Sequence, residues 1–377
     1  MTPEDVSPAR LTGPGTGSGP GSEPRPGQVT GKATAELFEQ VILRRLGAPD
    51  DDVLVGPKHG VDVGVVRVAD GVAMALTTDP VFVVPAYGWD RAAWFAVHIL
   101  ASDASTSGLP LRWMAVDLNL PPEVTDEELA RLWDAFHRAC EDLGIAVVTG
   151  HTARYDGCAW PMVGGATCLA LGGADAYVTP EMARPGDRVV VTKGAAIEAT
   201  ALFAATFPDR LTAALGPDVV RAADALFERM TVVPEATVAR RFGLRDRGVT
   251  SMHDATEGGV LGGLLEVAIA SGVGMRVDLE AVPVRPEVRA VCEHVGIDPY
   301  VSISEGTMIA TVTADRADAF VAELTADGID AATVGEILPR DAGRSVVEGA
   351  ERRPLAHPGL DPFWAAFGAW ASAAAAS

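Results

Sequence analysis

Residues 251–263, SMHDATEGGVLGG, place an acid, a hydroxyl and two glycines directly before an apolar run. Asp254 and Thr256 are residue types that cap helices, and the apolar residues after Gly258 and Gly259 continue as a buried helical run. We therefore expect a loop that leads into a helix N-terminus. Such an end presents free N–H groups, the glycines let a phosphate approach the backbone, and a neighbouring acid suits Mg2+. An ordinary capped helix is the alternative interpretation.

The size and charge of the chain limit the possible classes of protein. Its 377 residues are enough for two packed domains, and 48% hydrophobic with 21% charged residues is typical of a globular protein. A formal net charge of -21 argues against a nucleic-acid partner or an anionic membrane, because both need a basic surface. A nucleotide site in such a chain would need a divalent metal to screen the charge, although the excess charge also fits a simple role in solubility.

The cysteines and the hydrophobic runs favour a cytoplasmic protein. The four cysteines form no CxxC pair, so they indicate neither a zinc site nor a disulfide framework. No run of 18 apolar residues and no basic-then-apolar leader occurs in the sequence, so we expect no membrane span.

The N-terminal half alternates between strand and helix patterns. Residues 1–28 are rich in Gly, Pro and Ser and are predicted to be a disordered arm, with a flap over phosphates as the alternative. A helix is predicted over 32–46. Strand patterns follow between residues 53 and 84, with Asp62 before the first strand and Asp79 after the second, where either acid could bind a metal or simply form a turn.

A second pair of candidate residues lies further along this half. A helix over 90–108 carries Asp103 among small residues, where a carboxylate is costly unless it is paired or metal-bound. His151 lies in the predicted loop 149–157 and could be a ligand, an acid-base group or a turn residue.

The pattern as a whole predicts an α+β fold with two domains. Strands and helices alternate on both sides of a Pro- and Gly-containing boundary at 180–186, without the strict rhythm of a parallel sheet. We predict a disordered arm over 1–28, an ATP-binding dimerisation domain over 29–180, a second domain over 181–340 and a C-terminal tail over 341–377, where periodicity is lost.

Six short motifs stand in an order that resembles one superfamily. It is that of aminoimidazole ribonucleotide synthetase (PurM-like), which also holds the HypE-type dehydratases, selenophosphate synthetase and thiamine-monophosphate kinase. The second half is most similar to the HypE-type branch. The motifs are Asp62 in GVDVGVV, Thr78-Asp79 after an apolar strand, Asp103 followed by SGLP, Gly150-His151-Thr152, Pro185-Gly186-Asp187 before VVVTKG, and HDATEGGV.

The resemblance implies a fold and a site. The fold would be two α+β domains, with the N-terminal sheets of two subunits completing a barrel in a homodimer, a C-terminal α/β sandwich, and ATP near the subunit interface. The implied ligands of Mg2+ and the nucleotide phosphates are Asp62, Asp79, Asp103 and Asp254. The other implied site residues are Lys32, Thr78, Thr256, Gly258, Gly259 and, more weakly, Glu305.

Two departures from the family pattern limit what is carried over. HypE-type chains end in a cysteine that carries the group to be dehydrated, whereas this chain ends AWASAAAAS, so the hydrogenase-maturation reaction is not expected. Several members have an acid where this chain has His151, and we hypothesise that His151 is a general acid or base.

The chemistry implied is phosphorylation by ATP of an amide- or carbonyl-type oxygen of a small molecule, which drives dehydration, cyclisation or ligation. Two alternatives remain. The first is a small-molecule kinase of the thiamine-monophosphate kinase type, which would stop at a stable phosphoester. The second is a non-catalytic nucleotide-binding protein, although clustered carboxylates that repel each other without a cation argue against it.

Overall fold

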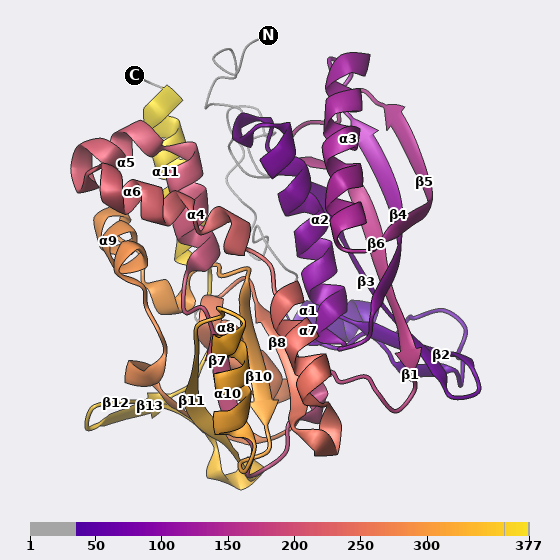
Figure 1. Cartoon of the computed structure of the whole chain (residues 1–377), viewed down its shortest axis with the longest axis vertical. Coiled ribbons are helices and arrows are strands. Elements are labelled where there is room, and N and C mark those ends of the chain that lie inside the picture. Colours follow the sequence, from indigo (N-terminus) through magenta and orange to yellow (C-terminus); the bar gives the residue numbers. More distant parts are fainter. Residues whose placement is uncertain (1–34, 358, 376–377) are drawn as a thin grey trace.

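The computed structural model describes residues 35–357 and 359–375, which form two α+β units with one mixed sheet each (Figure 1). The first unit carries a six-stranded sheet and the second a seven-stranded sheet. The chain passes from one unit to the other between Gly173 and Arg188. The two-unit α+β architecture is therefore the one predicted from the sequence.

The first sheet has the strand order β1-β2-β3-β6-β4-β5, and only β4 and β5 run parallel. Helices α2 (Trp89–Thr106) and α3 (Asp126–Asp142) cover one face. Alanines on the buried side of α2 let it lie close to the strands, and a capping box at Thr125 and Glu128 begins α3. The strands are β1 (Val53–Val55), β2 (Gly64–Ala69), β3 (Val72–Phe82), β4 (Leu111–Leu120), β5 (Ala146–Arg154) and β6 (Met162–Gly173).

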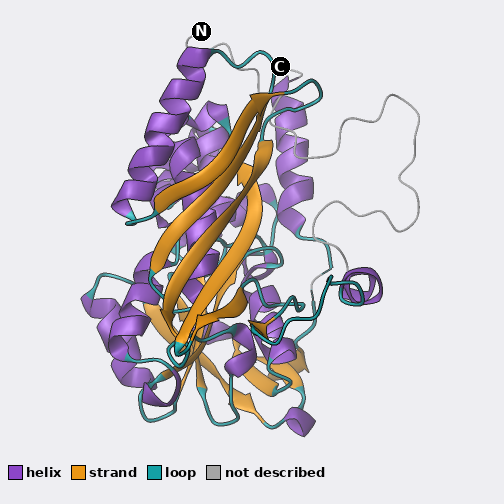
Figure 2. Cartoon of the chain, turned by 90° about the vertical axis from the view of Figure 1, so that its right-hand side faces the viewer, coloured by secondary structure: helices purple, strands orange, loops and turns teal. Residues whose placement is uncertain are grey.

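The other face of this sheet, here called the open sheet face, has no helix in front of it in Figure 2. Apolar side chains on three neighbouring strands share this face, because directly opposed residues point the same way. All of them are only partly buried. They are Met74 and Leu76 of β3, Leu169 and Leu171 of β6, and Trp113 of β4.

The second sheet has the order β13-β12-β9-β11-β7-β10-β8 and is covered on both faces. Helix α8 (Gly259–Ala270) packs on one face, and α7 (Val233–Phe242) and α10 (Ala317–Ala326) pack on the other. The strands are β7 (Arg188–Thr192), β8 (Val249–Ala255), β9 (Gly274–Asp278), β10 (Thr307–Val312), β11 (Ala331–Leu338), β12 (Arg344–Glu348) and β13 (Glu351–Pro354).

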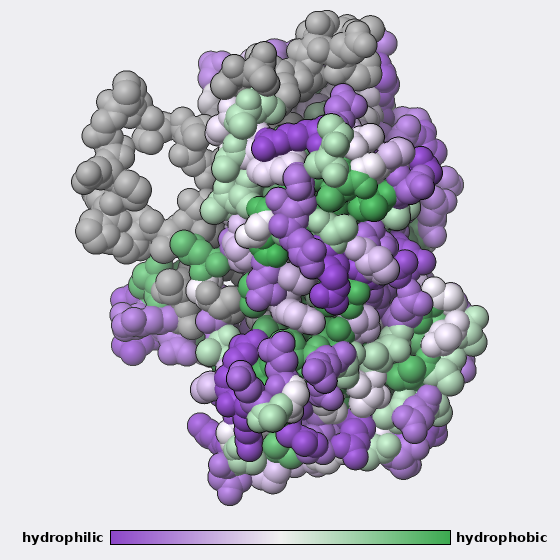
Figure 3. Space-filling model, turned by 90° about the vertical axis from the view of Figure 1, so that its left-hand side faces the viewer, coloured by the Kyte–Doolittle hydropathy of each residue, from purple (hydrophilic) through white to green (hydrophobic). Residues whose placement is uncertain are grey.

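A helical layer lies beside the second sheet. It consists of α4 (Ile197–Thr206), α5 (Pro208–Leu215), α6 (Pro217–Asp224), α9 (Pro286–Val295) and α11 (Pro362–Ala375), which share one apolar core. On this side of the molecule hydrophobic residues stand in small groups between hydrophilic ones (Figure 3). Short 3-10 turns lie at Pro85–Tyr87, Pro180–Met182, Phe227–Arg229, Arg245–Arg247, Leu279–Ala281, Pro299–Val301 and Arg340–Ala342.

Both ends of the described chain differ from the sequence-based expectation. Residues 32–34 of the helix predicted over 32–46 lie outside the described residues, as does the predicted arm over 1–28. From residue 35 there are α1 (Ala35–Leu37) and one π-helical turn (Phe38–Ile42) that ends before residue 46, and Leu37, Val41 and Ile42 are exposed rather than buried. Beyond residue 340, where the sequence loses periodicity, β12, β13 and α11 are regular elements, with Val346 and Phe363 buried. No helix among the described residues is long and apolar enough to cross a membrane.

Candidate active site

Four carboxylates meet where α2 of the first unit contacts β8 of the second. Asp62 precedes β2, Asp79 lies in β3, Asp103 in α2 and Asp254 in β8. Burial raises the pKa of Asp103 well above its usual value, and the charge of Asp254, a hydrogen bond with Asp79 and the charge of Asp62 raise it further. All three other carboxylates therefore lie near Asp103. We call these four residues the acid cluster.

Two glutamates extend the acid cluster within the second unit. Glu305, which follows the turn at residues 299–301, donates its backbone N–H to Glu198 Oε2 of α4 over 3.0 Å. Burial raises the pKa of the Glu305 carboxyl well above its usual value, and the nearby charges of Asp254 and Glu198 add to this effect. Burial likewise raises the pKa of Glu198 to about 8. Glu305, predicted as a weaker candidate, therefore lies beside Asp254.

So many buried acids are costly unless a cation compensates their charge. Hydrogen bonding compensates part of it, since Thr77 donates its hydroxyl to Asp103 Oδ2 over 3.1 Å. The remaining carboxylate oxygens are the ligand type that Mg2+ prefers. The donor set therefore fits Mg2+.

A buried histidine lies beside the acid cluster and contacts Asp62. His253 is 1% exposed, and its Nε2 lies 2.9 Å from Glu266 Oε2 in α8 while its Nδ1 lies 3.3 Å from Asp62 Oδ2. Burial alone would lower its pKa, but the hydrogen bond to Glu266 and the charges of Asp62, Glu266 and Asp254 raise it to about 9. Without a bound metal, this imidazolium neutralises part of the negative charge.

The glycines of the predicted phosphate loop form the turn before α8. Gly258 adopts a left-handed conformation with φ of 81°, and its N–H donates to Asp361 Oδ2 over 2.8 Å. A Cβ on Gly259 would lie 2.6 Å from the carbonyl oxygen of Ser302, so only glycine fits there. Thr256 precedes this turn and is partly buried. The expected helix N-terminus is present, and a carboxylate already binds one of its N–H groups.

Two predicted site residues point away from the acid cluster. Thr78 faces the other side of β3 from Asp79 and hydrogen-bonds Thr167 over 2.8 Å. His151 lies in strand β5 rather than in a loop, three strands from β3, on the open sheet face with its partner Asp117. Its Nε2 is 2.9 Å from the hydroxyl of Tyr155. Lys32 lies outside the described residues.

The sequence did not single out five residues that shape the site. Local spacing gives no signal for most of them, because they come from separate elements that meet only in the folded chain. His253 is the exception, since it directly precedes Asp254 in the motif. The five residues are Thr77, Glu198, His253, Glu266 and Asp361.

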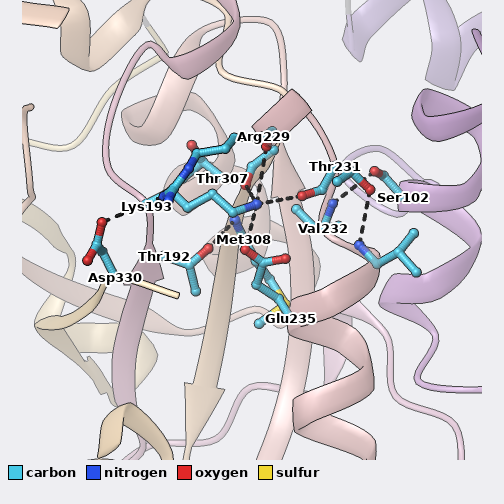
Figure 4. A network of polar contacts seen from close by, with 12 residues as sticks. Ser102, Thr192, Lys193, Arg229, Thr231, Val232, Glu235, Thr307, Met308 and Asp330 are labelled. Atoms are coloured by element: carbon cyan, nitrogen blue, oxygen red, sulfur yellow. Dashed lines mark hydrogen bonds and ion pairs between the residues drawn. The ribbon is translucent and has the colours of Figure 1, made fainter. Parts of the chain in front are cut away.

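A network around a buried lysine of the second unit reaches helix α2 of the first unit (Figure 4). Lys193 Nζ donates to the carbonyl oxygens of Thr231 at 2.6 Å and Gly306 at 2.9 Å, and it pairs with Glu235 Oε1 at 2.6 Å. Ser102 of α2 accepts the N–H of Val232 over 3.0 Å. The network therefore fixes the helix that carries Asp103 and the turn next to Glu305.

Comparisons with known proteins give the family. Residues 60–172 match the model of "AIR synthase related protein, N-terminal domain", and residues 184–348 match that of "AIR synthase related protein, C-terminal domain". A carbamoyl dehydratase HypE of Rhizobium leguminosarum bv. viciae is 28% identical over 319 residues, which cover 82% of this chain and 85% of the relative.

Solved structures share the fold. The thiamine monophosphate kinase AaThiL of Aquifex aeolicus, complexed with AMPPCP and TMP, has a TM-score of 0.65 at 19% identity and covers 86% of this chain and 97% of the kinase. Hydrogenase maturation protein HypE in complex with ATP has a TM-score of 0.58 at 21% identity and covers 89% and 97%. Since the two family models together match well over half of the sequence, the chain belongs to the AIR synthase related family, with its PurM-like two-domain fold.

Proposed function

We propose that this protein is an ATP-dependent enzyme that phosphorylates an amide- or carbonyl-type oxygen of a small molecule, so that phosphate leaves as the molecule is dehydrated, cyclised or ligated. The observation that carries the proposal is the acid cluster, where two units bring four carboxylates together at a site that needs a cation. The HypE relative, named a carbamoyl dehydratase, supports the dehydration class. The ATP and AMPPCP complexes of proteins with this fold support the nucleotide.

Each element of the site has a role in this proposal. Asp62, Asp79, Asp103 and Asp254 would hold Mg2+, which neutralises phosphate charge and aligns the transferring group when it is bound. Gly258 and Gly259 let a phosphate approach the start of α8, where a phosphate oxygen would replace Asp361 Oδ2 on the N–H of Gly258, with Thr256 beside it. The raised pKa of Glu198, about 8, lets that carboxyl hold a proton near neutral pH, next to Asp254.

We further propose a homodimer formed through the open sheet face, with the sheets of two subunits closing a barrel. Unpartnered apolar residues on a long sheet are the kind of surface that such an interface covers. His151 and Thr78 would then lie at the interface rather than among the acids. A catalytic role of His151 would require a substrate bound at that interface.

A small-molecule kinase is the second candidate, because the fold is shared with AaThiL. The two candidates differ in their product. A stable phosphoester indicates a kinase, whereas free phosphate with a dehydrated, cyclised or ligated product indicates the synthetase reaction.

Calorimetric titration of ATP with and without Mg2+ tests the proposal. Wild type is expected to bind ATP only with Mg2+, Asp79→Asn to lose this binding, and Asp70→Asn, an exposed acid in the same hairpin, to keep it. Positive binding is followed by assays of phosphate release with amides and carbamoyl compounds. Sedimentation of the same sample is expected to give a dimer. Absence of ATP binding by the wild type under both conditions would remove the enzymatic proposal.

A further inference from the structure

His253 adds a buried ring nitrogen to the carboxylate oxygens of the acid cluster. It is buried at the end of β8, directly before Asp254, and its Nδ1 faces two carboxylates of the acid cluster. One ligand atom from each of Asp62, His253 and Asp254 lies within 4.8 Å of the others. That spacing fits three ligands around one metal ion, because metal–ligand bonds of about 2.1 Å leave neighbouring ligand atoms roughly 3–4 Å apart.

The far side of the ring is oriented by a carboxylate. Glu266 Oε2 accepts from Nε2 over 2.9 Å, which keeps a proton on Nε2 and directs Nδ1 toward Asp62 and Asp254, so that Nδ1 can offer its lone pair to a metal ion once the ion displaces the second ring proton. A carboxylate that binds one nitrogen of a metal-ligating histidine fixes its tautomer and raises its basicity. Glu266 therefore acts as a positioning residue.

Asp62 is held against the same helix that carries Glu266. A Cβ on Gly60 would lie 3.0 Å from Cβ of Glu266, so the backbone that leads to Asp62 packs directly on α8. Lys58 adds a hydrogen bond from Nζ to the carbonyl oxygen of Ala270, the last residue of α8, over 2.7 Å. One contact between the two units therefore positions both Asp62 and Glu266, the residue that orients the His253 ring.

We propose that His253 binds a divalent metal ion through Nδ1, together with Asp62 and Asp254, and that this position takes a first-row transition metal in preference to Mg2+. Imidazole nitrogen suits Mn2+, Co2+ and Zn2+, whereas Mg2+ favours a shell made only of oxygen. The inference rests on the proposed function in that the same pocket would receive the phosphates of ATP. Asp62 and Asp254 would then be shared between this ion and the Mg2+ of the acid cluster, to which Asp79 and Asp103 offer only oxygen.

Cobalt is a suitable probe, because its absorption bands report the ligands. The full-length chain, stripped of metal with a chelator, is titrated with Co2+ alone and with Mg2+ alone, and the bands are recorded. Wild type is expected to bind Co2+ at least about 100-fold more tightly than Mg2+. In His253→Asn, whose Oδ1 can replace the ring nitrogen, Co2+ affinity is expected to fall about 10-fold or more and the bands to shift, with Mg2+ affinity changed less than about 3-fold.

Two further variants separate the loss of a metal ligand from the loss of its orientation and from metal binding at the protein surface. Glu266→Gln is expected to weaken Co2+ about 10-fold and leave a band characteristic of a nitrogen ligand, as a positioning role requires. His137→Asn removes an exposed histidine that pairs with Glu141 on α3 and is expected to change nothing at the tight site, which controls for surface binding. Thermal unfolding of each metal-free variant checks that it is folded.

Several outcomes would overturn the inference. It fails if wild type binds Co2+ and Mg2+ equally well, or if folded His253→Asn keeps the wild-type Co2+ affinity and spectrum. If the protein turns over ATP with Mg2+ but does not bind Co2+ more tightly than Mg2+, only the inference is refuted. Tight Co2+ binding through His253 without any binding of ATP would refute only the proposed function.

Discussion

Glu198 shows that folding places an acid of the site where its ionisation is unfavourable. Glu198 accepts the N–H of Glu305, and the charges of Asp361, Glu257 and Asp254 all act on its carboxylate. Burial is the largest cause of its raised pKa. The folded chain therefore holds this proton more tightly than the unfolded chain does, so ionisation of Glu198 destabilises the fold.

The consequence is a pH-dependent stability that Glu198→Gln removes. The usual pKa of the group is 4.5 and the folded value is about 8, so protonation stabilises the fold fully below about pH 4.5, and this stabilisation is lost as the pH rises to about 8. Near pH 8.5 the variant is expected to have a free energy of unfolding about 2 kcal/mol higher than wild type, with little difference near pH 4.5. Urea unfolding across this range measures the difference. Glu293→Gln, at an exposed site, is the control, and parallel curves for Glu198→Gln and wild type would contradict the prediction.

The sequence predicts the acids of this site better than it predicts their partners. Asp62, Asp79, Asp103 and Asp254 stand in recognisable motifs, and the structure places them together. Glu198 and Glu266 lie on faces of helices α4 and α8 whose apolar patterns say nothing about which loop or strand they will meet. Those contacts arise only from the docking of separate elements, which local patterns do not encode.

At the scale of elements, the sequence-based prediction is least accurate at the C-terminus. Residues 341–377 carry little periodicity because β12 and β13 are short and the last helix is rich in alanine. Yet α11 is anchored by aromatic residues. The Trp370 ring lies 5.6 Å from that of Phe203 and 5.5 Å from that of Phe207, and the Arg210 guanidinium lies 3.6 Å above it. Tertiary packing rather than pattern determines this element.

Loss of that anchor should therefore destabilise the whole chain. Trp370→Ala removes a buried ring from the core shared with α4 and α5, and the expected loss in the free energy of unfolding is about 3–5 kcal/mol. Trp364→Ala, in the same helix but 38% exposed, is expected to cost under about 2 kcal/mol. Urea denaturation of both variants checks the difference. Equal effects of the two substitutions would show that α11 does not pack on the core in solution.

At the scale of the whole molecule, the site depends on how the two units dock. The α+β class and the two-part organisation follow from the alternating patterns of strands and helices. Their relative position does not, because it rests on buried polar contacts such as that of His98 Nδ1 with Thr231 Oγ1, at 2.9 Å. Lys193, in an ordinary-looking VTKG turn, binds the Thr231 carbonyl on the second-unit side of these contacts and has a φ of 57°, uncommon for a residue other than glycine.

The Lys193 network gives the last prediction. Lys193→Met leaves Glu235 as an unpaired charge in the core and removes the donor from the carbonyl oxygens of Thr231 and Gly306, so the free energy of unfolding is expected to fall by about 3–5 kcal/mol. Replacing both charges, as Lys193→Met with Glu235→Leu, removes the unpaired charge and is expected to recover part of that loss, because a buried ion pair is costly to desolvate. Urea unfolding of the two single variants and the double variant measures the coupling.

A second readout separates stability from docking. Because the network also fixes Ser102, one residue before Asp103, the double variant is expected to stay folded yet bind Mg2+–ATP more weakly than wild type. Full recovery of stability together with wild-type ATP binding would show that hydrophobic packing alone holds the units in register. Recovery of stability without recovery of binding would mean that the buried ion pair is retained for the geometry of the acid cluster, at the expense of the stability that an apolar pair would give.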